Sequence, residues 1–479
     1  MSRPAEEVVT RLRQEVVAGR TRSTRWRRAQ LDGLERLLTE ESAAVIDAVT
    51  DDLGRSRTEV ALTEVWGVVR EIAHLRRGLP RWSADEAVRT PVALRPGRSW
   101  VRREPVGLVG VIGPWNYPVN LVLSPMAAAL AAGNGVVAKP SELAPATSSL
   151  LARLVPRFLD PAAVAVCEGG AEVAESLVDA GLDHVLFTGS PAVGRLVAVR
   201  AAERLVPVTL ELGGKSPVVV DRTVDLEAAA FRIAWGKLFN AGQSCIAPDY
   251  LLVEEATKGR LLAALELAVA RLYGPDPARH PDFGRIVSDR HVVRLAGLLE
   301  GHKGTVAMGG RVDLASRYVA PTVVVDPDPA SPLMTEEIFG PILPVVGVAD
   351  LDEAASWIRA RPDPLALYVF SEDGVAVDRL LAATRSGSVG WNTTMHQFAS
   401  SYLPFGGIGR SGTGAYHGRH GVERLSHRRA VLQKPLRPDL PLAYPPYPPW
   451  KARLLTAALS LPSRLRTTFV RWEEEEGGG

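Results

Sequence analysis

Short apolar runs alternate along the chain with longer segments in which apolar residues recur at helical spacing. From residue 106 onward, the apolar runs predict buried strands at 106–112, 136–139, 164–167, 184–189 and 207–212. Strands that alternate with helices favour a parallel, doubly wound sheet with right-handed crossovers. A second series of the same kind begins near Lys215 and continues to Asn392. The pattern therefore predicts an α/β fold with two doubly wound parallel-sheet domains.

Helical patterns fill the first part of the chain and the segments between the strands. Before about residue 75 the apolar positions repeat at helical spacing, as at Leu31, Leu34, Leu37 and Leu38. Ser124 and Pro125 predict the start of another helix, as its N-cap and first-turn residue. Gly133 predicts the end of that helix.

Two segments depart from this pattern. Residues 80–104 are rich in Pro and Arg and contain short extended pieces, which predicts a hairpin or arm outside the main core. After Lys434 a proline-rich tether leads to a short apolar helix candidate at 451–461, and a charged tail follows Pro462. The composition of that tail predicts disorder.

Composition narrows the classes of function. A chain of 479 residues exceeds one ordinary core, and its net charge of +2 gives no overall attraction to nucleic acid or acidic lipid. The basic run at 20–29 is typical of a solvated helix face. The N-terminus lacks the apolar core of a signal peptide, and no apolar run reaches the ~18 residues of a membrane span. The two cysteines, Cys167 and Cys245, suit a reducing compartment.

Three residues are candidates for catalysis. Cys245 lies in a turn between a helix pattern and a strand pattern, where a thiol can be reached, whereas Cys167 ends an apolar strand and is expected in the core. Glu211 follows an apolar strand and precedes two glycines, so its carboxylate can point into a crevice or can be an exposed loop acid. Asn116 follows the first parallel strand and can donate a hydrogen bond to an oxyanion.

Residues suited to a nucleotide follow two other strands. Lys139 and Glu142 come after the second strand of the first series, where they can hold ribose hydroxyls. Gly189 and Ser190 precede a predicted helix whose N–H groups can receive a phosphate. The GxGxxG fingerprint of many dinucleotide sites is absent from the first strand–helix turn.

Several of these motifs occur together and in a fixed order. The chain resembles an aldehyde dehydrogenase through GPWNYP, AAGNGVVAKPSE, FTGSPAVG, VTLELGGKSP, NAGQSCIAPDY, EEIFGPILP and LPFGGIGRSGTGAYHG, which span roughly residues 105–420. The short N-terminal region and the GAYHG ending resemble the class 3 or fatty aldehyde dehydrogenase branch.

The resemblance implies a mechanism. Cys245 would attack the aldehyde carbon, and the Asn116 amide with the Cys245 backbone N–H would hold the resulting oxyanion. Glu211 would activate the water that hydrolyses the thioester.

The resemblance also implies a cofactor, NAD, with NADP as an alternative. Lys139 and Glu142 would contact the adenosine ribose, and Gly189 with Ser190 would begin the adenosine and phosphate contacts. Glu337 would hold the nicotinamide ribose. Phe339 would pack nearby, or serve only in the core.

An apolar aldehyde, medium or long in chain or aromatic, is the implied substrate. Its tunnel is predicted to be lined by Tyr117, Trp235, Met395 and Phe405, for which ordinary core packing is the alternative. The pair His417 and His420 has no further ligand cluster near it in the sequence, so no metal site is expected.

By the same resemblance, the chain divides into an NAD-binding domain, a catalytic domain, a β bridging arm and a tail. Their predicted bounds are 1–79 with 101–211, 212–420, 80–100 with 421–436, and 437–479. The arm implies a homodimer. The tail resembles a fatty aldehyde dehydrogenase extension without its membrane anchor, so it can cover the substrate funnel or touch a membrane through Trp450. A cytoplasmic location, at a membrane surface in the second case, is expected.

Two other readings stay open. An acylating relative would pass the thioester to coenzyme A or run backwards as an acyl reductase, but it needs no carboxylate in the place of Glu211. A non-catalytic binding protein on the same scaffold would not need Cys245, Asn116 and Glu211 together.

Overall fold

The computed structural model describes residues 3–91, 94–439 and 444–460. The chain divides into two compact units, residues 1–83 with 104–427 and residues 84–103 with 428–479. Both large sheets lie in the first unit.

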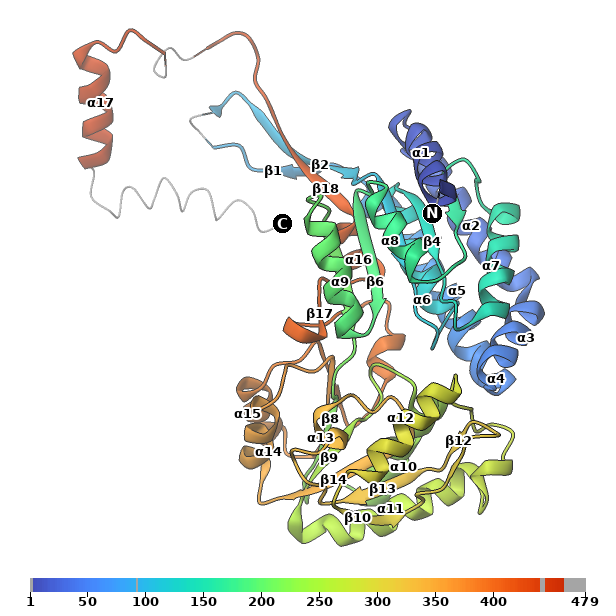
Figure 1. Cartoon of the computed structure of the whole chain (residues 1–479). Helices are drawn as coiled ribbons and strands as arrows, with labels where there is room; N and C mark the ends of the chain where they lie inside the picture. The colour runs from blue at the N-terminus through green and yellow to red at the C-terminus, as the bar shows by residue number, and fades with distance from the viewer. Residues whose placement is uncertain (1–2, 92–93, 440–443, 461–479) are drawn as a thin grey trace. The chain divides into compact units, whose positions relative to one another are not determined.

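The first of these is a six-stranded sheet in the order β17-β7-β6-β3-β4-β5. Figure 1 labels its strands β17, β6 and β4. Five strands are parallel and only the short β17 is antiparallel. The strands are β3 (Leu108–Ile112), β4 (Gly135–Lys139), β5 (Val164–Val166), β6 (His184–Gly189), β7 (Val208–Leu212) and β17 (Gly412–Thr413). The central strands are buried throughout, because helices cover both faces of a doubly wound sheet.

The helices of this part carry the leucine-rich faces that the sequence predicts. Leu31, Leu34, Leu37 and Leu38 are all fully buried in one cluster with the helix after β3. The helices are α1 (Arg3–Val17), α2 (Thr24–Glu40), α3 (Ser42–Leu53), α4 (Arg57–Val60), a π-helix (Ala61–Trp66), α5 (Gly67–Trp82), α6 (Asn120–Ala132), α7 (Pro145–Phe158), α8 (Ala171–Asp179), α9 (Pro191–Ala202) and α16 (Gly418–Arg424).

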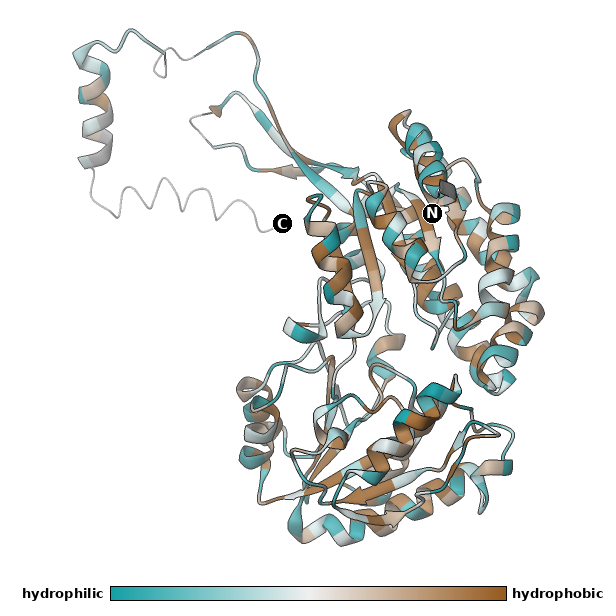
Figure 2. Ribbon diagram, in the orientation of Figure 1, coloured by the Kyte–Doolittle hydropathy of each residue, from teal (hydrophilic) through white to brown (hydrophobic). Residues whose placement is uncertain are grey.

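The second sheet has seven strands in the order β10-β13-β14-β9-β8-β15-β16, and only β10 is antiparallel. They are β8 (Pro217–Val220), β9 (Tyr250–Glu254), β10 (Thr305–Met308), β13 (Thr322–Val325), β14 (Ile342–Val348), β15 (Ala366–Phe370) and β16 (Ser388–Trp391). Figure 2 shows hydrophobic residues along the strands of both sheets, as expected for strands buried on both faces.

The helices of the second sheet include the pair α10 and α11, which pack side by side (Figure 1). They are α10 (Leu226–Leu238), α11 (Glu255–Tyr273), α12 (Asp289–Glu300), α13 (Pro332–Thr335), α14 (Leu351–Arg359) and α15 (Gly374–Ala383). A small two-stranded sheet joins β11 (Val312–Asp313) to β12 (Tyr318–Val319). The sequence therefore predicted the α/β class and its parallel sheets correctly.

One predicted helix boundary is wrong. The helix expected to begin at Ser124 is α6, and it begins at Asn120, with Pro125 inside it. The reason is a distant carboxylate: Glu64 Oε2 accepts hydrogen bonds from the backbone N–H groups of Val119, at 3.1 Å, and Asn120, at 2.8 Å. A side chain 55 positions away in the sequence thus caps the helix. Its end is as predicted, with Gly133 in the left-handed conformation.

The second unit contains a three-stranded sheet in the order β1-β2-β18. Its strands are β1 (Glu86–Val88), β2 (Arg98–Pro105) and β18 (Ser426–Gln433), followed by helix α17 (Pro449–Ser460). The arm was predicted at 80–100 and 421–436, but residues 80–82 belong to α5 and residues 421–424 to α16. Pro80 does not end α5, which continues to Trp82.

Part of the predicted tail, at 440–443 and 461–479, lies outside the described residues. Within the ranges that the structure describes, no helix combines the length and the apolar character needed to cross a membrane.

Candidate functional site

Cys245 follows a tight turn that leads from α10 into β9. Asn240, Ala241 and Gly242 all have positive φ, of 50°, 51° and 78°. Glycine is required at 242, because a Cβ there would lie 2.3 Å from the carbonyl oxygen of Gly340. The turn leaves the Cys245 side chain half-buried, at the wall of a cavity.

This cavity measures about 430 Å³. That volume is in the range of small-molecule sites in proteins. Its walls are mainly apolar and aromatic. Besides Cys245, they include three of the four predicted tunnel residues, Tyr117, Trp235 and Met395.

Other lining residues come from the π-helix, α5, the residue after α10, the loop that follows β16 and the residue before α16. Among them are Leu62, Trp66, Phe239, His396, Phe398 and His417. The Trp235 indole stacks on the His396 ring, with centroids 4.9 Å apart and planes at 14°.

Phe405, the fourth predicted tunnel residue, does not line the cavity. Its ring is 2% exposed and packs edge-on against Phe398, with centroids 4.7 Å apart, and it is Phe398 that faces the cavity. Phe405 thus supports the wall from behind, and the core alternative holds for it.

Asn116 lies beyond the carboxyl end of β3, next to the cysteine turn. Its side-chain amide donates a hydrogen bond to the Gln243 carbonyl oxygen at 3.0 Å. An amide NH₂ has two hydrogens, so a second donor remains. The structure thus brings together Asn116 and the segment that ends in Cys245, although 127 positions separate Asn116 from Gln243 in the sequence.

The Glu211 side chain is buried away from water. It belongs to β7 and is 1% exposed, and neither carboxylate oxygen has a hydrogen-bond partner among the residues described. Burial, together with the negative charge of Glu337, raises the pKa of Glu211 well above its ordinary value. The exposed-acid alternative is therefore wrong, and a raised pKa brings this carboxyl group toward the range of a general base.

Loss of hydration also acts on the thiol. It raises the pKa of Cys245 well above its ordinary value, with the charges of Glu211 and Glu337 adding to the effect. The Glu337 carboxylate lies against Gly213, two positions after Glu211, and the charges of both acids act on the sulfur. The resting cysteine is a neutral thiol, so its proton must leave when it attacks.

Glu337 lies in the loop between α13 and β14. Its Oε1 accepts a hydrogen bond from the Gly214 N–H at 3.2 Å, and burial raises the pKa of Glu337 to about 8. A Cβ on Gly213 would lie 2.1 Å from the other carboxylate oxygen, which explains the first of the two glycines that follow Glu211. Phe339 has φ of 50° and meets the Trp115 ring at 5.4 Å.

The predicted nucleotide residues follow β4 and β6, at the edge of the sheet where β3 and β7 also end. Lys139 Nζ pairs with Glu142 Oε2 at 2.7 Å, and the Glu142 side chain is half exposed. Ser190 caps α9 by accepting the Val193 N–H at 3.3 Å, and Gly189 ends β6. Ligands of open parallel sheets bind at this edge, so the residues fit a nicotinamide nucleotide.

Residues 4–431 of the chain match the family model described as the aldehyde dehydrogenase family. The chain belongs to this family.

Its curated relatives include class 3 enzymes. Aldehyde dehydrogenase family 3 member B2 of Mus musculus is 44% identical over 458 residues, covering 95% of each chain. The "dimeric NADP-preferring" aldehyde dehydrogenase of Rattus norvegicus is 43% identical over 444 residues, covering 92% of this chain and 98% of the relative. The class 3 branch is thereby confirmed.

Solved structures of aldehyde dehydrogenases superpose on this chain. A substrate-bound AldH of Staphylococcus aureus superposes with a TM-score of 0.92 at 38% identity, covering 95% of this chain and 99% of that one. An indole-3-acetaldehyde dehydrogenase complexed with NAD+ superposes with a TM-score of 0.84 at 28% identity, covering 90% of this chain and 89% of that one. The protein is an NAD(P)-dependent aldehyde dehydrogenase.

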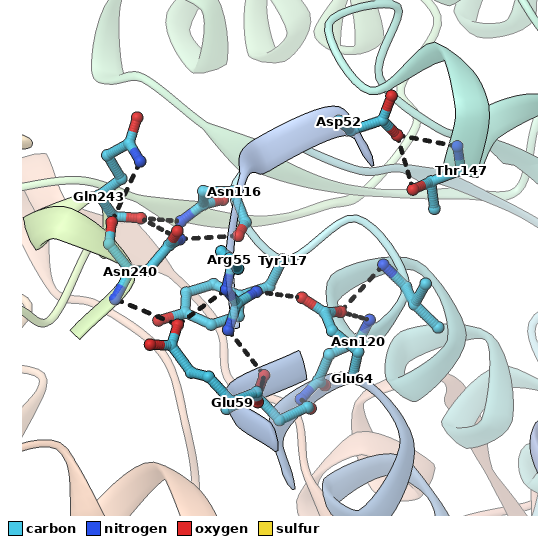
Figure 3. A network of polar contacts seen from close by, with 12 residues as sticks. Asp52, Arg55, Glu59, Glu64, Asn116, Tyr117, Asn120, Thr147, Asn240 and Gln243 are labelled. Carbon is cyan, nitrogen blue, oxygen red and sulfur yellow. Dashed lines mark hydrogen bonds and ion pairs between the residues drawn. The ribbon is translucent and has the colours of Figure 1, made fainter. Parts of the chain in front are cut away.

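The sequence did not predict a polar network that lies behind Tyr117 and the cysteine turn of this aldehyde dehydrogenase (Figure 3). It joins Arg55, Glu59 and Glu64 to the turn at Asn240 and to Tyr117, whose hydroxyl lies 2.5 Å from Ser244 Oγ. The only sequence signal was an Arg and a Glu four positions apart, at 55 and 59, in an otherwise helical pattern.

Metal ligands do not gather in the site. His417 is buried with φ of 85°, and its ring packs against the rings of Phe405 and Phe398. Across residues 3–91, 94–439 and 444–460, no group of three His, Cys, Asp or Glu side chains could hold a metal ion.

Proposed function

We propose that Cys245 is the nucleophile of this aldehyde dehydrogenase. Its sulfur adds to the aldehyde carbon, a C–S bond forms, and the carbonyl π electrons move to oxygen. Burial keeps the resting thiol neutral, so the thiol first gives its proton to water in the cavity and the sulfur adds as the thiolate. The position of Cys245 in the wall of the 430 Å³ cavity is the observation that supports this role most directly.

Asn116 and the Cys245 backbone N–H hold the negative oxygen of the adduct. The Asn116 amide is 3% exposed and is fixed by its bond to the Gln243 carbonyl, so one of its hydrogens has a set direction. Donors that are fixed before the reaction stabilise developing charge without a cost of reorganisation.

Glu211 is the base that activates water for hydrolysis of the thioester. Water adds to the acyl carbon, the C–S bond breaks, the acid leaves, and the cysteine regains a proton. A carboxyl group with a raised pKa is suited to this work. An acylating enzyme would not require such a base, so this position of Glu211 favours hydrolysis over transfer to coenzyme A.

The strand ends of the first sheet bind the cofactor. Lys139 and Glu142 lie where the adenosine ribose would sit, with Gly189 and Ser190 at the phosphates. Glu337 holds the nicotinamide ribose, with Phe339 beside it. When bound, the nicotinamide accepts the hydride that the aldehyde carbon loses. The first sheet thereby serves as the cofactor domain, and the second as the catalytic domain.

NAD is the proposed cofactor, with NADP as an alternative. The Glu142 carboxylate disfavours the added phosphate of NADP, but its pairing with Lys139 weakens that repulsion. The rat relative is named for a preference for NADP.

The substrate is an aldehyde with an apolar body, of medium or long chain or aromatic. Tyr117, Trp235 and Met395 give the cavity apolar walls around Cys245. The test is NADH formation with alkyl aldehydes of rising chain length and with benzaldehyde. Values of kcat/KM that rise with chain length support the proposal. Activity restricted to short aldehydes contradicts it.

The assembly is a homodimer in this proposal. β18 is an edge strand of the three-stranded sheet, and an edge strand can pair with another chain. The rat relative is named as dimeric. Analytical ultracentrifugation of the purified chain tests this, and a monomer at micromolar concentration would contradict it.

For location we propose the cytoplasm, with contact at a membrane surface through α17. This helix exposes Trp450 at 53% and Leu454 at 52%. Apolar side chains on a short helix can enter a bilayer interface. Co-sedimentation with vesicles tests the contact, and Trp450→Ala should weaken it. Equal sedimentation of both proteins would contradict it.

A further inference from the structure

Arg55 is a buried cation beneath the candidate site. It is 1% exposed, and its Nε and Nη1 atoms donate to Glu59 and Glu64, each at 2.8 Å (Figure 3). Its guanidinium also lies 4.6 Å from the centre of the Tyr117 ring. A buried cation with this set of partners has one geometry, so the groups around it are fixed.

Glu59 links Arg55 to the turn that precedes Cys245. The same carboxylate oxygen that accepts from Arg55 also accepts the backbone N–H of Asn240 at 3.1 Å. Asn240 and the next residue both have left-handed φ, which costs about 1 kcal/mol or more for each residue with a side chain. The turn before Cys245 is thus held in a conformation that it would not keep alone.

The Asn240 side chain then joins the two candidate catalytic segments. Its Nδ2 donates to the Asn116 carbonyl oxygen at 2.9 Å and to the Gln243 carbonyl oxygen at 3.2 Å. The Gln243 carbonyl oxygen also accepts a hydrogen bond from the Asn116 side-chain amide, at 3.0 Å. One amide therefore bridges the backbone that carries Asn116 and the backbone that leads to Cys245.

We propose that Asn240, held by Glu59 and Arg55, is a positioning residue that sets the spacing between the oxyanion donor Asn116 and the nucleophile Cys245. This inference rests on the catalytic roles proposed above for those two residues. Asn240 is fully buried and does not line the cavity, so it acts through its neighbours and not on the substrate.

The expected effect is on the chemical step. Stabilisation of an oxyanion depends on the placement of its donors, and a shift of about 1 Å can cost roughly 100-fold in rate. Asn240→Gly keeps the left-handed turn, because glycine has no φ penalty, and removes both side-chain hydrogen bonds. We expect kcat to fall by about 10- to 100-fold, with the Kd for NAD within about twofold of wild type.

A double-mutant cycle separates positioning from loss of stability. Once Asn116 is replaced by Ala, no side-chain donor is left for Asn240 to position. In that Asn116→Ala background, Asn240→Gly should therefore lower kcat by less than about threefold. An equal fold-loss in the wild-type and Asn116→Ala backgrounds would overturn the proposal.

Asp52→Asn is the matched control. Asp52 lies three positions from Arg55 in the sequence, but its carboxylate accepts from the Ala146 N–H at 3.0 Å, at the start of α7. It also accepts from the N–H and the hydroxyl of Thr147, at 2.8 Å and 2.7 Å (Figure 3). Its loss should lower the midpoint of thermal unfolding and leave kcat per folded enzyme within about twofold. If Asn240→Gly changes kcat no more than Asp52→Asn does, the positioning role is wrong.

Glu59→Gln is the second variant, for use if Asn240→Gly does not fold. It keeps an oxygen for the Asn240 N–H but removes the charge that holds Arg55, and its kcat should fall in the same way. The catalytic roles are checked in parallel with Cys245→Ala and Asn116→Ala. If those two retain full turnover, both proposals are wrong. If they lose turnover while Glu59→Gln and Asn240→Gly match the control, only the positioning inference is wrong.

Discussion

Glu211 and Glu337 are two carboxylates of one site, and the charge of Glu337 raises the pKa of Glu211. Glu211 has no hydrogen-bond partner among the described residues, whereas Glu337 accepts one backbone N–H. Two neighbouring carboxyl groups in a poorly hydrated place do not both ionise readily. This arrangement destabilises the charged form of Glu211, which is the form that a general base needs, and it leads to the first two predictions.

Glu211→Gln should slow hydrolysis of the thioester without preventing its formation. We expect the steady-state rate to fall by roughly 100-fold or more, the usual weight of a general base. Stopped-flow absorbance should still show the first turnover of NADH. If that first turnover also disappears while NAD still binds, Glu211 acts earlier, for example on the Cys245 thiol.

The same variant should change stability in a way that depends on pH. A raised folded-state pKa contributes stability that is fully present below about pH 4.5, the unfolded value, and is lost as the pH rises through the folded value. A glutamine at this position does not ionise, so the variant does not lose this stability as the pH rises. The midpoint temperature of Glu211→Gln relative to wild type should therefore increase from about pH 5 upward. Glu40→Gln, which changes an exposed glutamate paired with Arg36, should show no such trend. A flat difference for Glu211→Gln would contradict the burial of its charge.

Alkylation of Cys245 should report its raised pKa. In a Cys167→Ser background, the rate of reaction with iodoacetamide should still be rising at pH values above those of an ordinary thiol. Removing the charge of Glu211 lowers the pKa of the thiol, so Glu211→Gln should move the profile to lower pH. A profile that does not move would show that Glu211 has no influence on this sulfur.

Glu142 should govern the choice between the two cofactors. Glu142→Gln removes the charge that opposes a 2′-phosphate and frees the Lys139 ammonium, now paired at 2.7 Å. The ratio of kcat/KM for NADP to that for NAD should rise by about 2- to 5-fold, in keeping with an exposed charge. Glu175→Gln, which breaks an exposed pair with Arg200 elsewhere, should leave the ratio unchanged. An unchanged ratio in Glu142→Gln would place the adenosine ribose elsewhere.

Trp235 should determine affinity for the apolar part of the substrate. Trp235→Ala removes the indole that stacks on His396 at the cavity wall. Loss of such a contact should raise KM for long-chain or aromatic aldehydes about 10-fold and change kcat less. Acetaldehyde, which has only a methyl group to contact the cavity walls, should show a smaller change. Trp357→Ala, at a half-buried tryptophan of α14, is the control, and an equal effect there would contradict a role in the tunnel.

The local pattern of the sequence predicted most of the scaffold. Apolar runs and helical repeats depend on neighbours a few positions apart, so the strands that end near Asn116, Lys139 and Glu211 could be foreseen. The family motifs then assigned roles to those residues. A boundary such as the start of α6 could not be foreseen, because its cap is Glu64, a residue of another helix.

Only the tertiary structure decided how the site is supported and how its groups titrate. Phe405 and Phe398 are both aromatic in the sequence, and only packing places one at the cavity wall and the other behind it. The link from Glu59 to Asn240 spans 181 positions, and no local pattern encodes such a contact. The raised pKa of Glu211 likewise follows from removal of water by distant segments, which is a property of the fold and not of any short stretch of chain.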